Sequence, residues 1–197
     1  MQILNNFNLT LDRGQSLCLI GPNGAGKSTV LHSIYGFTII YSGDVLIDNN
    51  NVTKLTPAGK LKTAGVAYVL QDNYVLQDNY VFPDMTVEAN LLMGGYIKDN
   101  TEEAHQESEK IFEKYERLRK RRNQPAKVLS GGERRLLEIS RALVMKPSIL
   151  LVDEPSIGLE PRYIDIVFEI LIDLQKGENK TIILVEQNIK KDWSLLI

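Results

Sequence analysis

The sequence predicts an α/β fold with a parallel sheet, because short unbroken apolar runs recur between segments of helical character. The runs at 16–20, 148–153 and 181–185 do not alternate between apolar and polar residues. Such runs are typical of strands that are covered on both faces, as the strands of a parallel sheet are. A further strand is expected at 65–70, where it ends just before Gln71. We therefore expect these segments to form a sheet covered by helices.

The clearest helix prediction starts at Asn100 or Thr101 and extends to about Arg122. Asn100 is a good helix cap, acidic residues follow it in the first turn, and the basic run 119–122 suits the last turn. We interpret the basic run as a solvated helix end rather than a nucleic-acid surface, because no aromatic-rich basic surface accompanies it. The apolar positions spaced as one helical face are Ile111, Phe112, Tyr115 and Leu118.

Composition predicts one ordinary soluble domain over residues 1–197, with 43% hydrophobic and 24% charged residues. The formal net charge of −2 gives no general attraction to nucleic acid or anionic lipid. The one cysteine, Cys18, lies in the first apolar run, which excludes a disulfide framework and indicates a reducing compartment. No apolar run approaches the roughly 18 residues that span a bilayer, so direct membrane insertion is not expected.

A glycine-rich segment joins the first strand to a helix-like segment and matches the phosphate-binding pattern G-x-x-x-x-G-K-[ST]. Its glycines let successive backbone N–H groups point at one phosphate chain, and the following helix directs its positive end at the same anion. Lys27 would reach the β- and γ-phosphates of a nucleoside triphosphate, and Ser28 would bind Mg²⁺. A glycine turn with an incidental lysine is the weaker interpretation. The predicted nucleotide-binding residues here are Gly21, Pro22, Asn23, Gly24, Ala25, Gly26, Lys27, Ser28 and Thr29.

A pair of carboxylates, Asp153 and Glu154, follows the apolar run of the strand predicted at 148–153. In open α/β sheets this carboxyl-terminal edge is where ligands collect. Asp153 would hold Mg²⁺ through water, and Glu154 is predicted to polarise the water that attacks the γ-phosphate. An apolar strand that ends in Asp-Glu is common, but in a chain with a phosphate-binding loop it predicts a hydrolytic site.

The segment 129–133, Leu-Ser-Gly-Gly-Glu, lies between these two motifs and resembles the signature motif of ATP-binding cassette (ABC) ATPases. From the residues, Ser130 is expected to cap the next helix, and the two glycines admit an anion close to free N–H groups. The resemblance implies a P-loop NTPase core of the ABC ATPase type, in which this helix end contacts ATP held by a second subunit. The residues it assigns to that contact are Ser130, Gly131, Gly132 and Glu133.

The resemblance sharpens toward the ATP-binding subunits of branched-chain amino-acid importers. The segment 156–161 looks like the loop that follows the catalytic carboxylate, and 82–91 looks like the entry to a helical subdomain, at about 84–146, that docks on a membrane partner. Gln187 occupies a position where that group often has glutamine, and it can donate a hydrogen bond to the γ-phosphate without becoming charged. The resemblance thus implies an ATP-hydrolysing importer subunit with transmembrane permease partners, located in the cytoplasm at the inner face of the cell membrane.

Departures from the family pattern keep some expectations open. The six residues 68–73 recur without change at 74–79, so either Gln71 or Gln77 would sense the metal site. Gln71 is preferred, because it directly follows the predicted strand. The family has an adenine-stacking aromatic residue before the first strand and more chain after Gln187, so we expect a cassette that is incomplete at both termini. Two alternatives remain: a truncated, non-catalytic nucleotide-binding cassette, and a non-transport ABC ATPase acting on nucleic acid.

Overall fold

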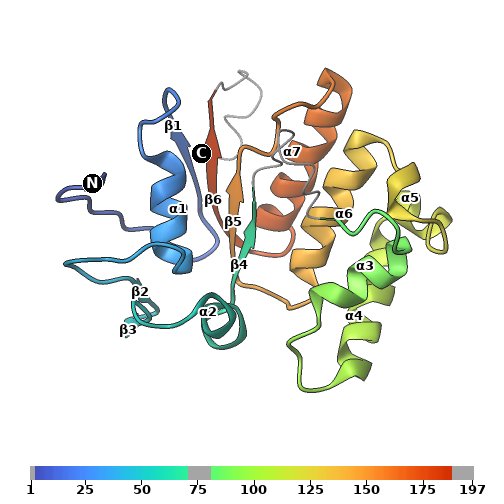
Figure 1. The fold of residues 1–197 in the computed structure, drawn as a ribbon, viewed down its shortest axis with the longest axis horizontal. Helices are drawn as coiled ribbons and strands as arrows, with labels where there is room; N and C mark the ends of the chain where they lie inside the picture. The colour runs from blue at the N-terminus through green and yellow to red at the C-terminus, as the bar shows by residue number, and fades with distance from the viewer. Residues whose placement is uncertain (1–2, 71–80, 188–197) are drawn as a thin grey trace.

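The computed structural model describes residues 3–70 and 81–187. Figure 1 shows a central sheet with helices on both sides. The elements follow one another as β1 (Ser16–Ile20), α1 (Lys27–Tyr35), β2 (Leu46–Ile47), β3 (Asn50–Asn51), α2 (Pro57–Ala64), β4 (Val66–Val69), α3 (Val87–Gly94), α4 (Thr101–Lys114), α5 (Glu116–Lys120), a 3₁₀ helix (Ala126–Val128), α6 (Gly131–Leu143), β5 (Ile149–Asp153), α7 (Pro161–Lys176) and β6 (Thr181–Glu186).

The main sheet is parallel and has the strand order β1-β6-β5-β4 within the described ranges. Its strands are those predicted from the unbroken apolar runs, with ends that differ by at most one residue. The pairing aligns Asp153 of β5 with Val185 of β6, and Ile20 of β1 with Glu186 of β6. Strands far apart in the sequence therefore end side by side, at the edge where the acidic pair lies.

Successive residues of the central strands enter two hydrophobic clusters on opposite faces of the sheet. On one face, Leu151 and Ile183 pack with Leu31 of α1. On the other face, strand residues pack with α6, α7 and the helices beyond them. The strand residues on that second face are Ala67, Val69, Leu150, Val152, Ile182 and Leu184. Burial of both faces explains why the sequence shows unbroken rather than alternating apolar runs.

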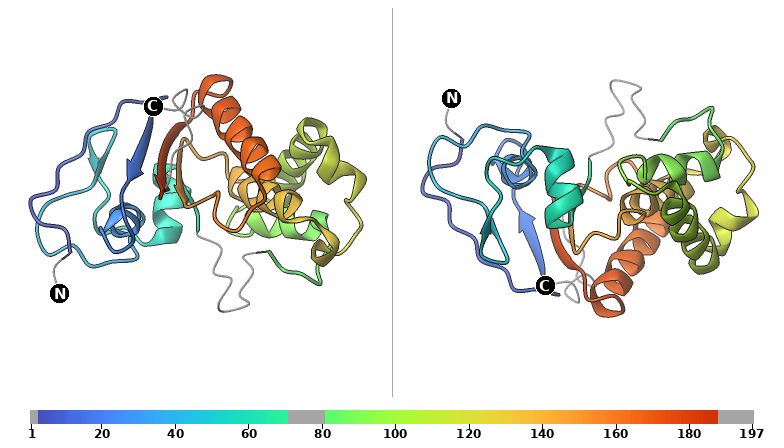
Figure 2. Two further views of the ribbon diagram at one scale, coloured as in Figure 1. Left: turned by 90° about the horizontal axis from the view of Figure 1, so that it is seen from above. Right: turned by 90° about the horizontal axis from the view of Figure 1, so that it is seen from below.

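The helices α3, α4 and α5 gather at the end of the molecule opposite to α1, β2 and β3, and both views of Figure 2 show this separation. Helix α6 packs against α3 and also against β4 and α7, so it connects these helices to the sheet. The region lies within the range 84–146 in which we expected a helical subdomain, and that division stays a prediction. No helix of the described residues has the length and apolar character needed to cross a membrane.

The single helix predicted to extend from Asn100 to Arg122 is wrong in one respect, because the helix breaks at Tyr115. Asn100 does cap α4 by accepting a hydrogen bond from the N–H of Glu102. At Tyr115 the backbone leaves the helical region, with φ −116° and ψ 85°. The change of direction still allows most of the predicted apolar face to be buried: Leu118 of α5 is fully buried in the same cluster as Phe112, and Tyr115 packs against that cluster half-buried.

Of the basic run 119–122, which we expected to be a solvated helix end, only the first two residues are largely exposed to solvent. The side chains of Arg119 and Lys120 are 58% and 71% exposed. Arg121 instead pairs with Glu133 of α6, and Arg122 pairs with Glu88 of α3 and with Glu109 of α4. The break at Tyr115 thus leaves these two arginines among carboxylates of neighbouring helices, where they hold the helices together.

Candidate functional site

The glycine-rich loop connects β1 to α1, and it leaves the N-terminus of α1 without a side-chain cap. Helix α1 begins at Lys27, and Gly26 precedes it in the left-handed region with φ 88°. Gly26 makes no side-chain cap hydrogen bond to the first turn. The first N–H groups of a helix have no partner within it, so an uncapped start is suited to bind an anion. The loop geometry therefore fits a phosphate group.

Lys27 lies beneath the glycine-rich loop and is 8% exposed. Its ammonium donates hydrogen bonds to the carbonyl oxygens of Gly21 and Pro22, at 2.7 and 3.0 Å. These contacts fix the cation at the opening of the loop, next to the start of α1. A phosphate placed there would meet one full positive charge in addition to the helix N-terminus.

Ser28 and Asp153, which are predicted to bind Mg²⁺, are brought together from opposite parts of the sequence. The Ser28 hydroxyl donates to Asp153 Oδ1 at 3.1 Å, and Asp153 is 3% exposed at the end of β5. Hydroxyl and carboxylate oxygens are the ligands that Mg²⁺ prefers, and here they face the predicted phosphate site. The donor set thus fits the ion that the resemblance implies.

Tyr68 is a site residue that the sequence analysis missed. Its hydroxyl donates to Asp153 Oδ2 at 2.9 Å, so each Asp153 oxygen accepts a hydrogen bond. The Tyr68 ring packs against the rings of His32, Tyr35 and Phe37, with centroids 5.4 to 5.9 Å apart. The available signal was a single hydroxyl within the otherwise apolar strand β4.

Glu154, the predicted general base, is 5% exposed and has a positive φ of 43°. Gln187 was expected to donate to the γ-phosphate, and in this structure its amide donates to Glu154 Oε2 at 2.9 Å. The backbone N–H of Glu154 donates to the carbonyl oxygen of Val185 at 2.9 Å. Glu154 is therefore held through its backbone by β6 and through its side chain by the residue that follows β6.

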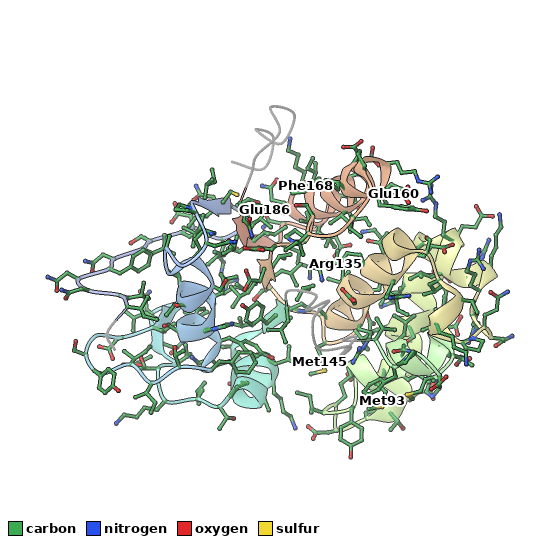
Figure 3. The ribbon with its side chains drawn as sticks, turned by 45° about the horizontal axis from the view of Figure 1, so that its top comes forward. Met93, Arg135, Met145, Glu160, Phe168 and Glu186 are labelled. Carbon is green, nitrogen blue, oxygen red and sulfur yellow. The ribbon has the colours of Figure 1, made fainter. Side chains whose placement is uncertain are left out.

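Glu186 is a second residue that the sequence analysis missed, and Figure 3 labels it at the end of β6. Its buried carboxylate accepts hydrogen bonds from the N–H and the hydroxyl of Ser156, at 3.0 and 2.9 Å. Burial raises the pKa of Glu186, hydrogen bonds from Ser156 and Gln187 lower it, and the charge of Glu154 raises it further, with a net increase. The carboxylate thus fixes the start of the segment 156–161 next to Glu154.

The N-terminus of α6 is closed by its own side chains. Ser130 Oγ accepts a hydrogen bond from the N–H of Glu133 at 3.4 Å, and the Glu133 carboxylate accepts one from the Ser130 N–H at 2.9 Å. The Ser130 hydroxyl also donates to Glu133 Oε2 at 3.0 Å. Burial raises the pKa of Glu133, but hydrogen bonds from Ser130 and Arg121 lower it further, so the net shift is downward.

The two glycines of the signature segment have different surroundings. A Cβ atom on Gly132 would lie 2.1 Å from the Tyr163 ring of α7, so glycine is needed there for helix packing. Gly131 is exposed, and a Cβ on it would only touch Leu159 at 3.4 Å. The approach of an anion to the backbone N–H groups of both glycines stays a prediction.

The structure brings together Lys27, Ser28, Asp153, Glu154 and Gln187 at one end of the parallel sheet. Gly131 and Glu154 line one narrow cleft between the start of α6 and the end of β5. Gln71 and Gln77, the candidate metal-sensing glutamines, lie outside the described residues, as does most of the repeat that contains them.

Comparison with known proteins identifies relatives along nearly the whole chain. A family model described as ABC transporter matches residues 4–157. BraG of Pseudomonas aeruginosa, a high-affinity branched-chain amino acid transport ATP-binding protein, is 38% identical over 195 residues, which cover 99% of this chain and 80% of that protein. A protein of Archaeoglobus fulgidus named "Probable branched-chain amino acid transport ATP-binding protein LivF" is 36% identical over 97% of this chain and 78% of its own length. LolD of Rickettsia bellii, a lipoprotein-releasing system ATP-binding protein, is 31% identical over 95% of this chain and 81% of its own length.

Solved structures of transporter cassettes have the same fold. One ATP-binding cassette of an ABC transporter superposes with a TM-score of 0.81 at 26% identity, covering 98% of this chain and 78% of that one. A dimeric ATP-binding cassette in a post-hydrolysis state, bound to ADP and phosphate, superposes with a TM-score of 0.73 at 26% identity, covering 94% of this chain and 80% of that one. By its sequence and its fold, this chain belongs to the ABC transporter ATP-binding family, whose members hydrolyse ATP.

Proposed function

We propose that this chain energises an importer of branched-chain or related amino acids by hydrolysing ATP with Mg²⁺ at a site completed by a second cassette. The observation that carries the proposal is the carboxylate of Glu154, buried beside Asp153 and hydrogen-bonded to Gln187. BraG and LivF, with 38% and 36% identity, support the amino-acid class. LolD, at 31% identity, has a lipoprotein-releasing role, so the transported solute needs its own test.

Each residue of the site has a distinct part in the proposed reaction. The N-terminus of α1 and Lys27 would bind the phosphates, while Ser28 and Asp153 would hold Mg²⁺. When bound, the ion would neutralise charge on the β- and γ-phosphates. Glu154 accepts a proton from the attacking water as the water oxygen bonds to the γ-phosphorus, and the bond to the bridging β–γ oxygen breaks. Gln187 fixes the orientation of the Glu154 carboxylate.

Each proposed ATP site is shared between two cassettes. The start of α6 in one cassette would contact the ATP that the other cassette binds through its own α1. Ser130 and Gly131 would contact the γ-phosphate of ATP bound to the partner cassette. The solved cassette that is dimeric and bound to ADP and phosphate supports the expectation of a second cassette. The helices within 84–146 would form the subdomain that contacts the permease subunits, since they lie at the end of the molecule opposite to α1.

The test compares ATP turnover by the purified wild-type chain, Glu154→Gln and Glu169→Gln. Glu169 is an exposed carboxylate on α7 and serves as the matched control. We expect Glu154→Gln to lower turnover by roughly 100-fold or more, because a positioned general base is lost, and to leave ATP binding intact. Equal turnover in all three proteins would contradict the role of Glu154. A wild-type chain that binds ATP without turnover would instead indicate the non-catalytic cassette.

The amino-acid class is tested by uptake of radiolabelled leucine in cells that lack this subunit. Wild-type protein should restore uptake, and a Lys27→Met variant should not, because its phosphate site has lost its cation. Restored release of lipoproteins with unchanged leucine uptake would assign the subunit to a different transporter class.

A further inference from the structure

Arg135 of α6 is 4% exposed and joins three elements of the chain. Its guanidinium donates to the carbonyl oxygen of Leu70, just after β4, at 3.0 Å, and to the carbonyl oxygen of Asp153, at the end of β5, at 3.3 Å. It also donates to Glu138 Oε2 at 2.6 Å. Figure 3 labels Arg135 between α6 and the strands of the sheet. A fork of N–H donors on one side chain is suited to hold several acceptors in fixed positions.

The contact with Asp153 is made to the peptide group that joins Asp153 to Glu154, and the orientation of this group determines the backbone conformation of Glu154. The carbonyl group of this peptide accepts from Arg135 Nη2, and its N–H, which belongs to Glu154, donates to Val185 at 2.9 Å. The peptide is therefore held at both of its polar ends. Glu154 has φ 43°, in the left-handed region that residues with a side chain seldom occupy. A strained backbone of this kind persists only where the surrounding contacts determine it.

The same arginine lies beside the reactive carboxylate. A cleft of about 10 Å³, the size of a single water molecule, is lined by Gly131, Arg135 and Glu154 together with neighbouring residues. Gly131 is the first residue of α6 and Arg135 is one turn further along it. A displacement of the start of α6 would therefore move the donor that holds the 153–154 peptide.

We propose that Arg135 is a positioning residue that orients Glu154 through the 153–154 peptide and thereby links the start of α6 to hydrolysis. This inference rests on the proposed role of Glu154 as the general base. ATP bound by the partner cassette would contact the N-terminus of α6, and Arg135 transmits the position of that helix to the site on its own chain. Glu138 supplies the counter-charge that a buried guanidinium needs.

The test removes the link without leaving a buried charge uncompensated. In Arg135→Met/Glu138→Met both charges of the pair are replaced by side chains that fill similar space. Arg135→Lys is the second variant; it keeps the charge beside Glu138, but a single ammonium does not reproduce the fork that spans Leu70 and Asp153. Glu88→Met/Arg122→Met is the matched control, since it removes the ion pairs of Arg122 with Glu88 and Glu109, which lie remote from the sheet edge. Thermal unfolding of each protein gives its folded fraction.

Two readouts are measured on each full-length variant: hydrogen exchange of the segment 150–157, and the kcat and KM of ATP hydrolysis. We expect both Arg135 variants to lower kcat by roughly tenfold to a hundredfold with KM nearly unchanged, because a charged hydrogen bond is lost. Exchange at 150–157 should become faster in both, and the control should match wild type in both readouts.

Unchanged exchange at 150–157 in Arg135→Lys would overturn the inference. So would a fall in kcat that follows only the loss of folded protein. Exchange is measured without turnover, so it still tests the link if the wild-type chain does not hydrolyse ATP. In that case the proposed function fails, while faster exchange would still show that Arg135 positions the peptide.

Discussion

The N-termini of α1 and α6 are both assigned to ATP phosphates, yet they are built in opposite ways. Helix α1 starts after a glycine and has no side-chain cap. Helix α6 starts after Ser130, and its capping box with Glu133 satisfies the N–H groups of Ser130 and Glu133 within the chain. An uncapped start is ready to receive an anion, whereas at a capped start the capping hydroxyl must exchange an internal hydrogen bond for an external one.

This difference suggests that the two helix starts act at different stages. A single chain should bind ATP through α1 alone, because the phosphate meets preformed donors and Lys27 there. Engagement of α6 by a partner's nucleotide should require the Ser130 hydroxyl to leave Glu133 Oε2, which it contacts at 3.0 Å. Binding and turnover should therefore respond differently to changes at the two sites.

The largest expected effect is on ATP affinity, which should fall when the start of α1 is changed but not when the start of α6 is changed. Lys27→Met should weaken ATP binding to the isolated chain by roughly tenfold to a hundredfold, because a charged contact with phosphate is lost. Ser130→Ala should leave that affinity unchanged while lowering turnover. Isothermal titration calorimetry measures the affinity of both variants. If both substitutions weaken binding equally, the comparison between the two helices is incorrect.

A second prediction sharpens the description of the α1 site by removing a hydroxyl beneath it. Tyr68→Phe should raise the Mg²⁺ concentration needed for half-maximal ATP binding by about tenfold, since the residue orients Asp153, the carboxylate that we propose binds the metal. Tyr35→Phe is the control, because Tyr35 packs in the same aromatic cluster. Titration of Mg²⁺ against a fluorescent ATP analogue gives both values. An equal shift in the two variants would assign the effect to ring packing instead.

At α6 the corresponding prediction concerns stability. Ser130→Ala should lower the free energy of unfolding by about 1 kcal/mol, because the cap of α6 is lost. Thr86→Ala, which removes the cap of α3, should cost a similar amount and leave turnover per folded molecule unchanged. Urea denaturation followed by circular dichroism measures both. No loss of stability in Ser130→Ala would mean that the capping box does not stabilise α6.

The smallest effect concerns Cys18 in β1, the strand that leads into the open helix start. Burial raises the pKa of the Cys18 thiol to about 11, and the charge of Glu186 adds to this. A raised thiol pKa means that the protonated form is favoured in the folded state. The contribution of the protonated Cys18 thiol to the free energy of unfolding is therefore fully present at pH values below the ordinary thiol pKa. It is lost as the pH rises to about 11.

Reaction with a thiol reagent checks this prediction. At pH 8 the folded protein should react much more slowly than the urea-unfolded protein, and its rate should increase as the pH approaches the raised pKa. Rapid labelling of the folded chain at pH 8 would show that the strand beneath α1 opens readily.

Local patterns were sufficient to predict the strands of the sheet, the cap of α4 and the cap of α6. Each depends on a few neighbouring residues, such as Asn100 or Ser130, whose chemistry acts within one turn. The break at Tyr115 was missed because the apolar spacing continues through it. The direction of α5 depends on tertiary contacts, among them the burial of Leu118 and the ion pairs of Arg121 and Arg122.

Within the site, the residues that the sequence analysis missed are those that act across long sequence separations. Tyr68 contacts Asp153, Arg135 contacts Leu70, and Glu186 contacts Ser156. None of these pairs belongs to a local motif, so no spacing rule could indicate them. The need for glycine at position 132 has the same origin, since it arises from the Tyr163 ring of another helix.

The last three residues of the described chain each contact a different part of the segment that carries Glu154, the proposed general base. Val185 accepts from the Glu154 backbone, Glu186 accepts from Ser156, and Gln187 donates to the Glu154 side chain. The pairing of β6 with β1 and β5 sets the positions of Val185 and Glu186, and Gln187 follows directly after the strand. A slip of β6 by one residue would turn the Glu186 side chain to the opposite face. The position of Glu154 therefore depends on the pairing register of β6. A substitution that shifts this register at the start of β6 would also displace Glu154.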